Sequence, residues 1–303
     1  MRRRRFPMAR ADVSVVVVTF DALPFIERCL DSVRGREVVV VDHGSTDGTV
    51  ELVRSRFPEV RLIEQANLGM GGGNNAGMRA GNGRYWFLLN SDAWVVGDGL
   101  DRLVEFADAH PSAAVVGPLL RNLDGSVQRS VRAEPTVWRL ATEYLGVRKL
   151  APGSHVLNPL YAGGFAHDEL RDADWLSGAA LLVRREAAER VGFFDEDFFM
   201  FGEEVDWLTR FRRDGWRVLF FPGAEVVHVG GATHGGSLYV ENLRGHLRFL
   251  EKHRGRTEAE RARLMLLWSL RVRGLAFRGE RGAQYRDGAR FLASGDVDAL
   301  LSR

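Results

Sequence analysis

Residues 38–49 read Val-Val-Val-Val-Asp-His-Gly-Ser-Thr-Asp-Gly-Thr, a short apolar run followed at once by turn-forming residues. Four β-branched residues without polar alternation predict a strand that is buried on both faces of a parallel sheet. The residues after it favour a turn, and we expect a helix over about residues 50–56. A buried strand, a polar turn and a helix in this order form one unit of an α/β fold.

The same rhythm extends on both sides of this unit. A buried strand is predicted at residues 13–20 and further strands at 60–63 and 85–89, with helical sequence between them. Such alternation implies a mostly parallel sheet with helices on both faces, and these sheets bind ligands at the carboxyl ends of their strands. The polar side chains that follow predicted strand ends are Asp21, Asp42, Asn90 and Asp92.

Composition limits the classes to which the chain can belong. Its 303 residues are 45% hydrophobic and 27% charged, which suits one large globular domain or two intimate ones. The net charge of +2 gives no case for a nucleic-acid partner. Cys29 is the only cysteine, which excludes an intrachain disulfide and a cysteine-rich zinc site. Since neither a signal peptide nor an apolar run of roughly 18 residues is recognisable, we expect a cytoplasmic protein.

Five segments occur in the order and at the spacing of one known family. They are residues 15–20, 40–49, 67–77, 88–92 and 198–207. In them the chain resembles glycosyltransferase family 2 with the GT-A fold, and within that family it most resembles bacterial rhamnosyltransferases of cell-surface polysaccharide synthesis. The resemblance extends from about residue 12 to about residue 250. It implies an α/β fold with a Rossmann-like, mostly parallel sheet flanked by helices, here followed by a C-terminal helical extension.

The resemblance assigns the ends of the first two strands to the nucleotide. In the family an acidic residue after the second strand binds the imide N–H of uracil or thymine, and Asp42 stands at that position. Thr19 and Asp21 lie beside it at the end of the first strand. The alternative is a turn in which Asp42 and its neighbours serve only the backbone. His43 stands where the family commonly has Asn, a change that would alter the ribose or base contact.

The glycine-rich segment Gly69–Gly73 superficially suggests a dinucleotide fingerprint. That motif follows the first strand of its fold, whereas this segment follows the third, and no P-loop pattern occurs in the chain. We expect a loop over residues 67–75 with a helix after it. The resemblance assigns Asn67, Gly69 and Asn74 to the nucleotide-sugar pocket, and the alternative is tight packing of the helix on the sheet.

Asn90-Ser91-Asp92 occupies the position of the family's metal motif, usually Asp-x-Asp. A nucleotide diphosphate leaving group accumulates negative charge, which Mg²⁺ or Mn²⁺ neutralises. The resemblance makes Asp92 a metal ligand and places Asn90 and Ser91 in the nucleotide-sugar site. His228 ends a later predicted strand and matches a histidine that completes the metal shell in many related folds. The alternatives are a polar turn at a strand end and a structural histidine.

An acidic pair, Glu203-Glu204, follows the apolar run at residues 198–201. The family has Glu-Asp here, and its Asp is the general base of an inverting transfer. Matched residue by residue, Glu204 takes that role, with Glu203 as the second catalytic candidate and Asp206 as the third. The alternative is an acidic first helical turn that the helix dipole favours. Gly178, in a segment that borders donor and acceptor in the family, is assigned to the sugar pocket, with a strand bulge as its alternative.

Four regions are expected along the chain. They are a basic arm over residues 1–11, a nucleotide-sugar-binding half over 12–100, an acceptor-binding and catalytic-base half over 101–237, and a basic helical region over 238–303. Other elements expected in the second half are a hairpin over 119–130, one strand over 175–183, two strands over 216–221 and 224–228, and a flexible loop over 230–236.

The C-terminal segment differs in charge from the rest of the chain. From Glu241 onward it carries 14 Lys and Arg against 8 Asp and Glu, so the preceding residues are net acidic. Its apolar run at residues 264–270 is flanked by arginines. This pattern fits peripheral contact with the inner face of the cell membrane, and it also fits packing on the domain or a homodimer interface.

Together these features predict an inverting, metal-dependent glycosyltransferase. It would move a sugar, rhamnose by the resemblance, from a UDP- or dTDP-sugar to a hydroxyl of a glycan or lipid-linked glycan acceptor. A nucleotidyltransferase is the alternative enzyme class, but it needs a basic loop after the first strand, and residues 20–24 hold no cation. A catalytically degenerate sensor or scaffold is the non-enzymatic alternative, because Asn90 and Glu204 depart from the family's pattern.

Overall fold

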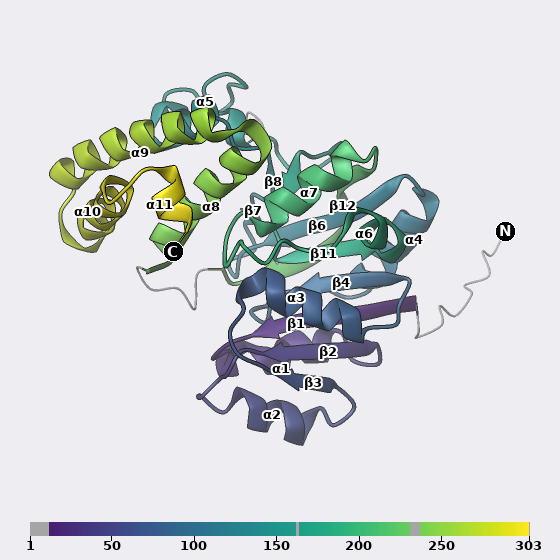
Figure 1. Cartoon of the computed structure of the whole chain (residues 1–303). Helices are drawn as coiled ribbons and strands as arrows, with labels where there is room; N and C mark the ends of the chain where they lie inside the picture. Colours follow the sequence, from purple (N-terminus) through teal and green to yellow (C-terminus); the bar gives the residue numbers. More distant parts are fainter. Residues whose placement is uncertain (1–11, 162–163, 231–236, 303) are drawn as a thin grey trace.

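The computed structural model describes residues 12–161, 164–230 and 237–302. The basic arm expected at residues 1–11 and nearly all of the loop expected at 230–236 lie outside the described residues. The described chain has an α/β fold built on one large sheet, which confirms the predicted fold class (Figure 1).

The large sheet has ten strands, eight of them along the path β3-β2-β1-β4-β11-β6-β12-β5. Its strands are β1 (Val13–Thr19), β2 (Glu37–Asp42), β3 (Arg61–Glu64), β4 (Tyr85–Leu89), β5 (Ala93–Val95), β6 (Ala113–Arg121), β7 (Val127–Gln128), β9 (Arg171–Asp172), β11 (Ala180–Arg184) and β12 (Arg217–His228). The first four of the path are parallel, and β11 runs antiparallel to β4 and β6. A separate pair consists of β8 (Val131–Arg132) and β10 (Trp175–Leu176).

Helices cover both faces of this sheet. The helices are α1 (Leu23–Ser32), α2 (Thr49–Arg56), α3 (Gly69–Ala80), α4 (Gly99–Ala109), α5 (Val137–Tyr144), α6 (Arg185–Val191), α7 (Glu203–Arg213), α8 (Ser237–Arg254), α9 (Arg256–Ala276), α10 (Gly279–Ala293) and α11 (Val297–Leu301), with 3-10 turns at Val147–Lys149 and Pro159–Tyr161. Residues of α1, α2 and α4 join the hydrophobic core on one face, and those of α3, α6 and α7 join the core on the other.

The valine-rich strands are buried on both faces, as their sequence predicts. Val15 and Val17 of β1 belong to one core and Val16 belongs to the other, and all three are fully buried. Because successive side chains of a strand point to opposite faces, only a strand covered on both sides can be apolar throughout.

The prediction of a loop over residues 67–75 is wrong, because α3 begins at Gly69. Its glycines let the helix pack closely on β1. A Cβ at Gly73 would lie 2.7 Å from Val18 Cγ1, and one at Gly77 would clash with Val16. Tertiary packing thus outweighs the low helix propensity of glycine, and the packing alternative accounts for these two residues.

The hairpin expected over residues 119–130 is confirmed by the antiparallel pairing of β6 with β7. Two other strand predictions in the second half of the chain are wrong. The single strand expected over 175–183 is split into β10 and β11, which belong to different sheets. The two strands expected over 216–228 are the single strand β12, whose register with β6 shifts between Phe221 and Glu225.

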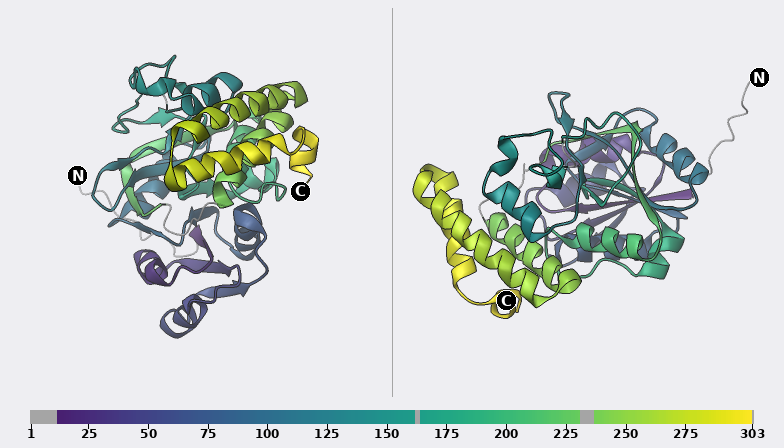
Figure 2. Two further views of the ribbon diagram at one scale, coloured as in Figure 1. Left: turned by 90° about the vertical axis from the view of Figure 1, so that its left-hand side faces the viewer. Right: turned by 90° about the horizontal axis from the view of Figure 1, so that it is seen from above.

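The C-terminal helices form a layer on one side of the molecule, and α5 packs against α9 within it (Figures 1 and 2). Leu247 of α8 and Leu266 of α9 belong to the same hydrophobic core as Trp207 of α7. The helical extension is therefore an integral part of the folded chain. Among the described residues, none of the helices has the length and apolar content to cross a membrane.

Candidate active site

A cavity of about 620 Å³ opens at the carboxyl ends of β1 and β4. Of the thirteen residues predicted for the site, those lining this cavity are Thr19, Asn67, Gly69, Asn74, Asn90, Ser91, Asp92, Gly178, Glu203, Glu204 and His228. Most of them lie at the carboxyl ends of β1, β4 and β12, in the turn before β11 and at the start of α7. The others lie just before α3 or in its first two turns. The fold therefore brings together residues that are far apart in the sequence.

Asp42 and Asp21 do not line this cavity. Asp42 is 1% exposed, and its Oδ2 accepts hydrogen bonds of 2.9 Å from the amides of Gly44 and Ser45. Asp21 Oδ1 accepts one of 2.7 Å from the amide of Thr46. Both carboxylates thus serve the turn after β2, as the turn alternative describes. Their role in base recognition stays a prediction.

Thr19 presents the opposite case at the end of β1. Its Oγ1 is buried and has no hydrogen-bond partner in the described part of the chain. A buried hydroxyl without a partner costs free energy, so such a group is typical of a site where a ligand supplies the missing bond.

Asp92 and His228 lie close together in the wall of the cavity. Asp92 Oδ1 lies 3.3 Å from His228 Nε2, and Asp92 Oδ2 accepts a 3.1 Å hydrogen bond from the amide of Gly230. The other ring nitrogen of His228 lies 2.6 Å from Gln128 Oε1, which fixes the orientation of the ring. Asn90 Nδ2 is 3.3 Å from His228 Nε2. Pairing of β5 with β12 brings these residues of distant segments together.

This donor set fits a divalent cation that takes its remaining ligands from the substrate. One carboxylate oxygen and one imidazole nitrogen lie close enough to share an ion, and Mg²⁺ sites commonly use one or two carboxylates plus phosphate oxygens. The described residues contain no cluster of three or more His, Cys, Asp or Glu that could hold a metal by itself. Burial alone would raise the pKa of Asp92, but hydrogen bonds from His228 and Gly230 lower it below its usual value.

Glu203 and Glu204 begin α7 and line the cavity. The Oε2 atom of each is buried and has no hydrogen-bond partner among the described residues. Burial raises the pKa of both carboxyl groups, that of Glu203 most strongly because the neighbouring charge of Glu204 adds to it. The charge of Arg132 acts in the opposite direction on Glu204. The pKa of Glu203 is therefore raised more than that of Glu204.

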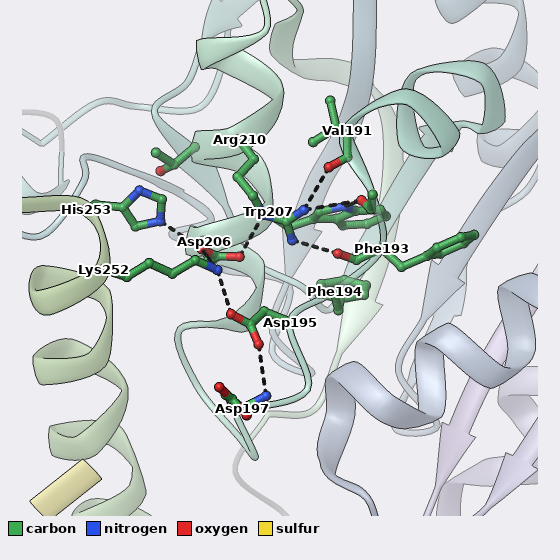
Figure 3. Close-up of polar contacts among 12 residues, drawn as sticks. Val191, Phe193, Phe194, Asp195, Asp197, Asp206, Trp207, Arg210, Lys252 and His253 are labelled. Carbon is green, nitrogen blue, oxygen red and sulfur yellow. Dashed lines mark hydrogen bonds and ion pairs between the residues drawn. The ribbon is translucent and has the colours of Figure 1, made fainter. Parts of the chain in front are cut away.

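Asp206 also lies in the first turn of α7, but it does not line the cavity. Its side chain is 0% exposed, and it forms ion pairs with Arg210 at 2.9 Å and Lys252 at 2.7 Å and a 2.7 Å hydrogen bond with His253 Nε2 (Figure 3). These partners outweigh the effect of burial and lower the pKa of Asp206 to about 2. Lys252 also pairs with Asp195, so this cluster joins α7, α8 and the segment before α7. Asp206 is therefore a structural acid, and the third candidate for the base is wrong.

Gly69 and Gly178 sit in the cavity wall for different reasons. Gly69 has a φ of +77°, and a Cβ there would clash with the backbone of Phe199, whose carbonyl accepts a 3.0 Å hydrogen bond from Met70. Gly69 thus lets α3 meet the segment before α7. At Gly178 a Cβ would lie 3.8 Å from Glu204 Cβ, an ordinary contact. The backbone there borders the proposed base.

Some lining residues were absent from the predicted set. Phe199, Met200 and Phe201 form an apolar wall next to the acidic pair. The run of aromatic residues before Glu203 was the available signal. His43 also lines the cavity, and burial lowers its pKa despite the nearby charge of Asp42. The contact of Gln128 with His228 had no signal in the sequence, because it depends on the β6–β7 hairpin.

A second cavity, of about 490 Å³, adjoins the first. The two cavities share Ser177, Phe201 and Glu204 as lining residues. Glu204 therefore lies between the two cavities. The larger one is at the carboxyl ends of the parallel strands, and the smaller one is lined in part by the C-terminal helices.

Comparison with known proteins decides the family. Residues 14–168 match the family described as Glycosyl transferase family 2. The chain belongs to this family. It is 37% identical over 245 residues to an N-acetylglucosaminyl-diphospho-decaprenol L-rhamnosyltransferase of Mycobacterium tuberculosis (strain H37Rv), an alignment that covers 71% of this chain and 75% of that protein. It is also 40% identical over 129 residues to a succinoglycan biosynthesis protein of Rhizobium meliloti, covering 40% and 36% of the two chains.

Solved structures of glycosyltransferases share the fold. A mannosyltransferase from Pyrobaculum calidifontis in complex with GDP-Man and Mn²⁺ is 20% identical, with a TM-score of 0.53 over 98% of this chain and 84% of that one. GalNAc-T7 with UDP, GalNAc and Mn²⁺ is 15% identical, with a TM-score of 0.59 over 96% and 56%. This family 2 chain is thus a glycosyltransferase with the GT-A fold, and the predicted enzyme class is confirmed.

Proposed function

We propose that this glycosyltransferase moves a sugar, L-rhamnose, from a UDP- or dTDP-sugar to a hydroxyl of a lipid-linked glycan, with inversion at the anomeric carbon. The observation that carries the proposal is the position of Glu204 between two cavities. The donor occupies the larger cavity, below the ends of β1 and β4, and the acceptor occupies the smaller one. The nature of both substrates follows the name of the mycobacterial relative.

The chemistry needs one base. Glu204 takes the proton of the acceptor hydroxyl while the oxygen attacks the anomeric carbon from the face opposite the diphosphate. The new glycosidic C–O bond forms as the bond between sugar and phosphate breaks, and the nucleoside diphosphate leaves with the electron pair. Glu203 keeps its proton and excludes a second negative charge from the site. The transfer needs no covalent enzyme intermediate, so configuration inverts.

Asp92 and His228 would hold a divalent cation, Mg²⁺ or Mn²⁺, with Asn90 beside it. The bound cation neutralises the charge that develops on the leaving diphosphate. Asp92 and His228 line the same cavity as Thr19 and Asn90, at the ends of β1 and β4, where the nucleotide would lie.

The test combines donor binding with transfer. Calorimetry on the wild-type protein is expected to show that Mn²⁺ tightens binding of one UDP- or dTDP-sugar, and that EDTA reverses the effect. Asp92→Ala is expected to remove the metal effect, while Asp98→Asn, an exposed acid before α4, leaves it unchanged. Sugar transfer with no effect of EDTA would refute the metal role. Release of inorganic diphosphate from a nucleoside triphosphate would favour a nucleotidyltransferase, and binding without turnover would favour a sensor.

We also propose that α9 rests on an anionic membrane surface. The exposed residues of its outer face include Arg261, Leu264, Trp268, Arg271, Val272 and Leu275. Residues 261–278 contain no Asp or Glu. An apolar stripe flanked by arginines, without acids, is typical of a helix that lies in the interface of anionic lipids. A lipid-linked acceptor would be reached from that surface.

Vesicle sedimentation tests this contact. Wild-type protein is expected to bind vesicles rich in phosphatidylglycerol and not vesicles of phosphatidylcholine alone. Leu264→Gln with Trp268→Gln is expected to abolish the binding, whereas Leu123→Gln, an equally exposed leucine near the β6–β7 hairpin, retains it. Unchanged vesicle binding by the double variant would refute the contact. A dimer in solution that the double variant separates would identify the face as a homodimer interface instead.

A further inference from the structure

The smaller cavity has a polar end that the transfer chemistry does not use. Its walls come from β8, β10, α5, α8, α9 and α10, with the first turn of α7 where it meets the donor cavity. Its volume of about 490 Å³ lies within the range of small-molecule sites. Most of these walls belong to segments beyond residues 14–168, the part of the chain that matches the family.

Arg273 of α9 is the most informative group at this end. Its guanidinium donates a 3.3 Å hydrogen bond to the backbone oxygen of Glu143 and lies 3.4 Å from the hydroxyl of Tyr285. Within the described residues it has no carboxylate at ion-pairing distance, and the carboxylate of Glu143 is paired with Arg148 instead. A partly buried cation without an anionic partner is typical of a site for an anionic ligand.

Tyr239 of α8 supplies an independent observation. Its hydroxyl is buried, lines the same cavity and has no hydrogen-bond partner among the described residues. Burial raises the pKa of Tyr239, so the hydroxyl keeps its proton and is a donor at neutral pH. A buried O–H without an acceptor is rare in a folded protein and indicates that a ligand accepts its hydrogen bond.

Arg132 of β8 contributes a second positive charge. Arg132 lines the cavity, and its charge lowers the pKa of both Glu204 and His246, so it lies near both groups. His246 has a pKa of about 4, because burial and this neighbouring charge both oppose its protonation. The imidazole is therefore neutral and does not compete with an anion for the two arginines.

We propose that this cavity binds an anionic acceptor, a saccharide attached through a phosphate or diphosphate, with Arg273, Arg132 and Tyr239 holding the phosphate oxygens and Glu204 meeting the sugar hydroxyl. The inference rests on the proposed function and specifies how its acceptor is recognised. The aromatic residues Trp175, Tyr144 and Phe249 also line the cavity, and the Arg132 guanidinium lies 5.0 Å from the centroid of the Trp175 ring.

The two faces of α9 agree with this arrangement. Arg273 points into the cavity, whereas Val272 and Leu275 lie on the exposed apolar stripe of the same helix. A phosphate bound at Arg273 would therefore have its lipid chain at the edge of the face that we assign to the membrane. The sugar, on the other side of the phosphate, would lie towards Glu204.

The experiment uses a pair of water-soluble acceptors on the full-length enzyme. One is N-acetylglucosamine linked through a diphosphate to a short alkyl chain, and the other is the same sugar linked directly to that chain. Arg273→Gln is expected to raise the KM of the diphosphate acceptor by about ten- to a hundredfold, the value of one or two charge-assisted hydrogen bonds, and to leave the neutral acceptor unchanged. Arg273→Lys should restore part of the loss, and the affinity for the nucleotide-sugar should not change in either variant.

Tyr239→Phe is the second variant, because it removes one oxygen and keeps the ring in place. It is expected to raise the KM of the diphosphate acceptor by about fivefold or more and to leave that of the neutral acceptor unchanged. Arg281→Gln, an exposed arginine of α10, is the matched control and should behave like the wild type. Equal loss with both acceptors, or no loss in either variant, would overturn the inference.

Direct binding separates this inference from the proposed function. Calorimetry with the diphosphate acceptor alone, in the absence of donor, is expected to give a signal that Arg273→Gln abolishes. If the donor binds and sugar is transferred while that signal is missing or unchanged in the variant, only the acceptor site is refuted. If no nucleotide-sugar binds or reacts, the proposed function fails, whatever the acceptor does.

Discussion

The first turn of α7 holds buried acids in two opposite environments. Glu203 and Glu204 face a cavity, have oxygens without hydrogen-bond partners among the described residues, and have raised pKa values. Asp206, two residues after Glu204, is surrounded by Arg210, Lys252 and His253 and has a pKa of about 2 (Figure 3). One helix thus carries acids that bind a proton readily beside an acid that does not.

The difference shows how the chain separates chemistry from structure. A carboxylate that must accept a proton cannot be fully neutralised by cations, and so it remains costly to bury. The neighbouring cluster offsets this cost, because Asp206 fixes α7 to α8 and to the segment that contains Asp195. Substitutions of these acids should therefore act on different properties, rate for Glu204 and stability for Asp206.

The largest effect is expected from Glu204→Gln. Removal of the base should lower kcat of sugar transfer by about 10²- to 10⁴-fold while the affinity for the nucleotide-sugar is kept. Thermal unfolding checks that the fold is intact. In the wild type, transfer should rise with pH through a pKa above the usual 4.5 of Glu, because only the ionised carboxyl group accepts the proton. A variant with near-normal turnover would exclude Glu204 as the base.

The next effect concerns stability and comes from Asp206→Asn. The substitution leaves three basic groups without their shared anion, and we expect a loss of about 3 kcal/mol in the free energy of unfolding, since Lys252 and Arg210 are partly exposed to water. Urea denaturation measures the change. Asp197→Asn, which removes an exposed acid from the same cluster, should cost less than about 0.5 kcal/mol. Equal losses in the two variants would contradict the structural role of Asp206.

The pH dependence of the same two proteins sharpens the comparison. Asp206 is ionised more easily in the folded protein than in the unfolded chain. Its contribution to the free energy of unfolding is therefore fully present above the usual pKa of 3.8 and is lost as pH falls towards about 2. The difference in unfolding free energy between wild type and Asp206→Asn should therefore be constant from pH 7 to about 5 and shrink below pH 4. Denaturation at pH 7, 5, 4 and 3 tests this. A difference that grows in acid would show the opposite sign of coupling.

The smallest effect is expected from Glu203→Gln. Its carboxyl group has a raised pKa when folded, so ionisation on unfolding favours the unfolded state as pH rises above the usual 4.5. The variant should be as stable as the wild type or more stable, by about 1 kcal/mol at pH 7, and the gain should vanish below pH 4.5. It should also retain more transfer than Glu204→Gln. A marked loss of stability would mean that the carboxyl group makes a stabilising contact.

Much of the fold could be predicted from local sequence, and the resemblance to the family supplied eleven of the residues that line the larger cavity. Runs such as Val15–Val18 can only be strands buried on both faces, and their polar ends identify the edge at which ligands bind. The start of α3 could not be predicted, because its glycines are helical only where Val16 and Val18 lie against them. For the same reason the structural role of Asp206 was hidden, since its partners Lys252 and His253 are more than forty residues away in the sequence.

The contact between α5 and α9 has a consequence for how such enzymes diversify. Ser269 of α9 donates a hydrogen bond to the backbone oxygen of Tyr144 at the end of α5, so the C-terminal helices and the middle of the chain close the smaller cavity together. The larger cavity, by contrast, has most of its polar residues in the segment that matches the family. Exchange of the helices after residue 237 between relatives should therefore transplant acceptor preference while the donor is inherited unchanged.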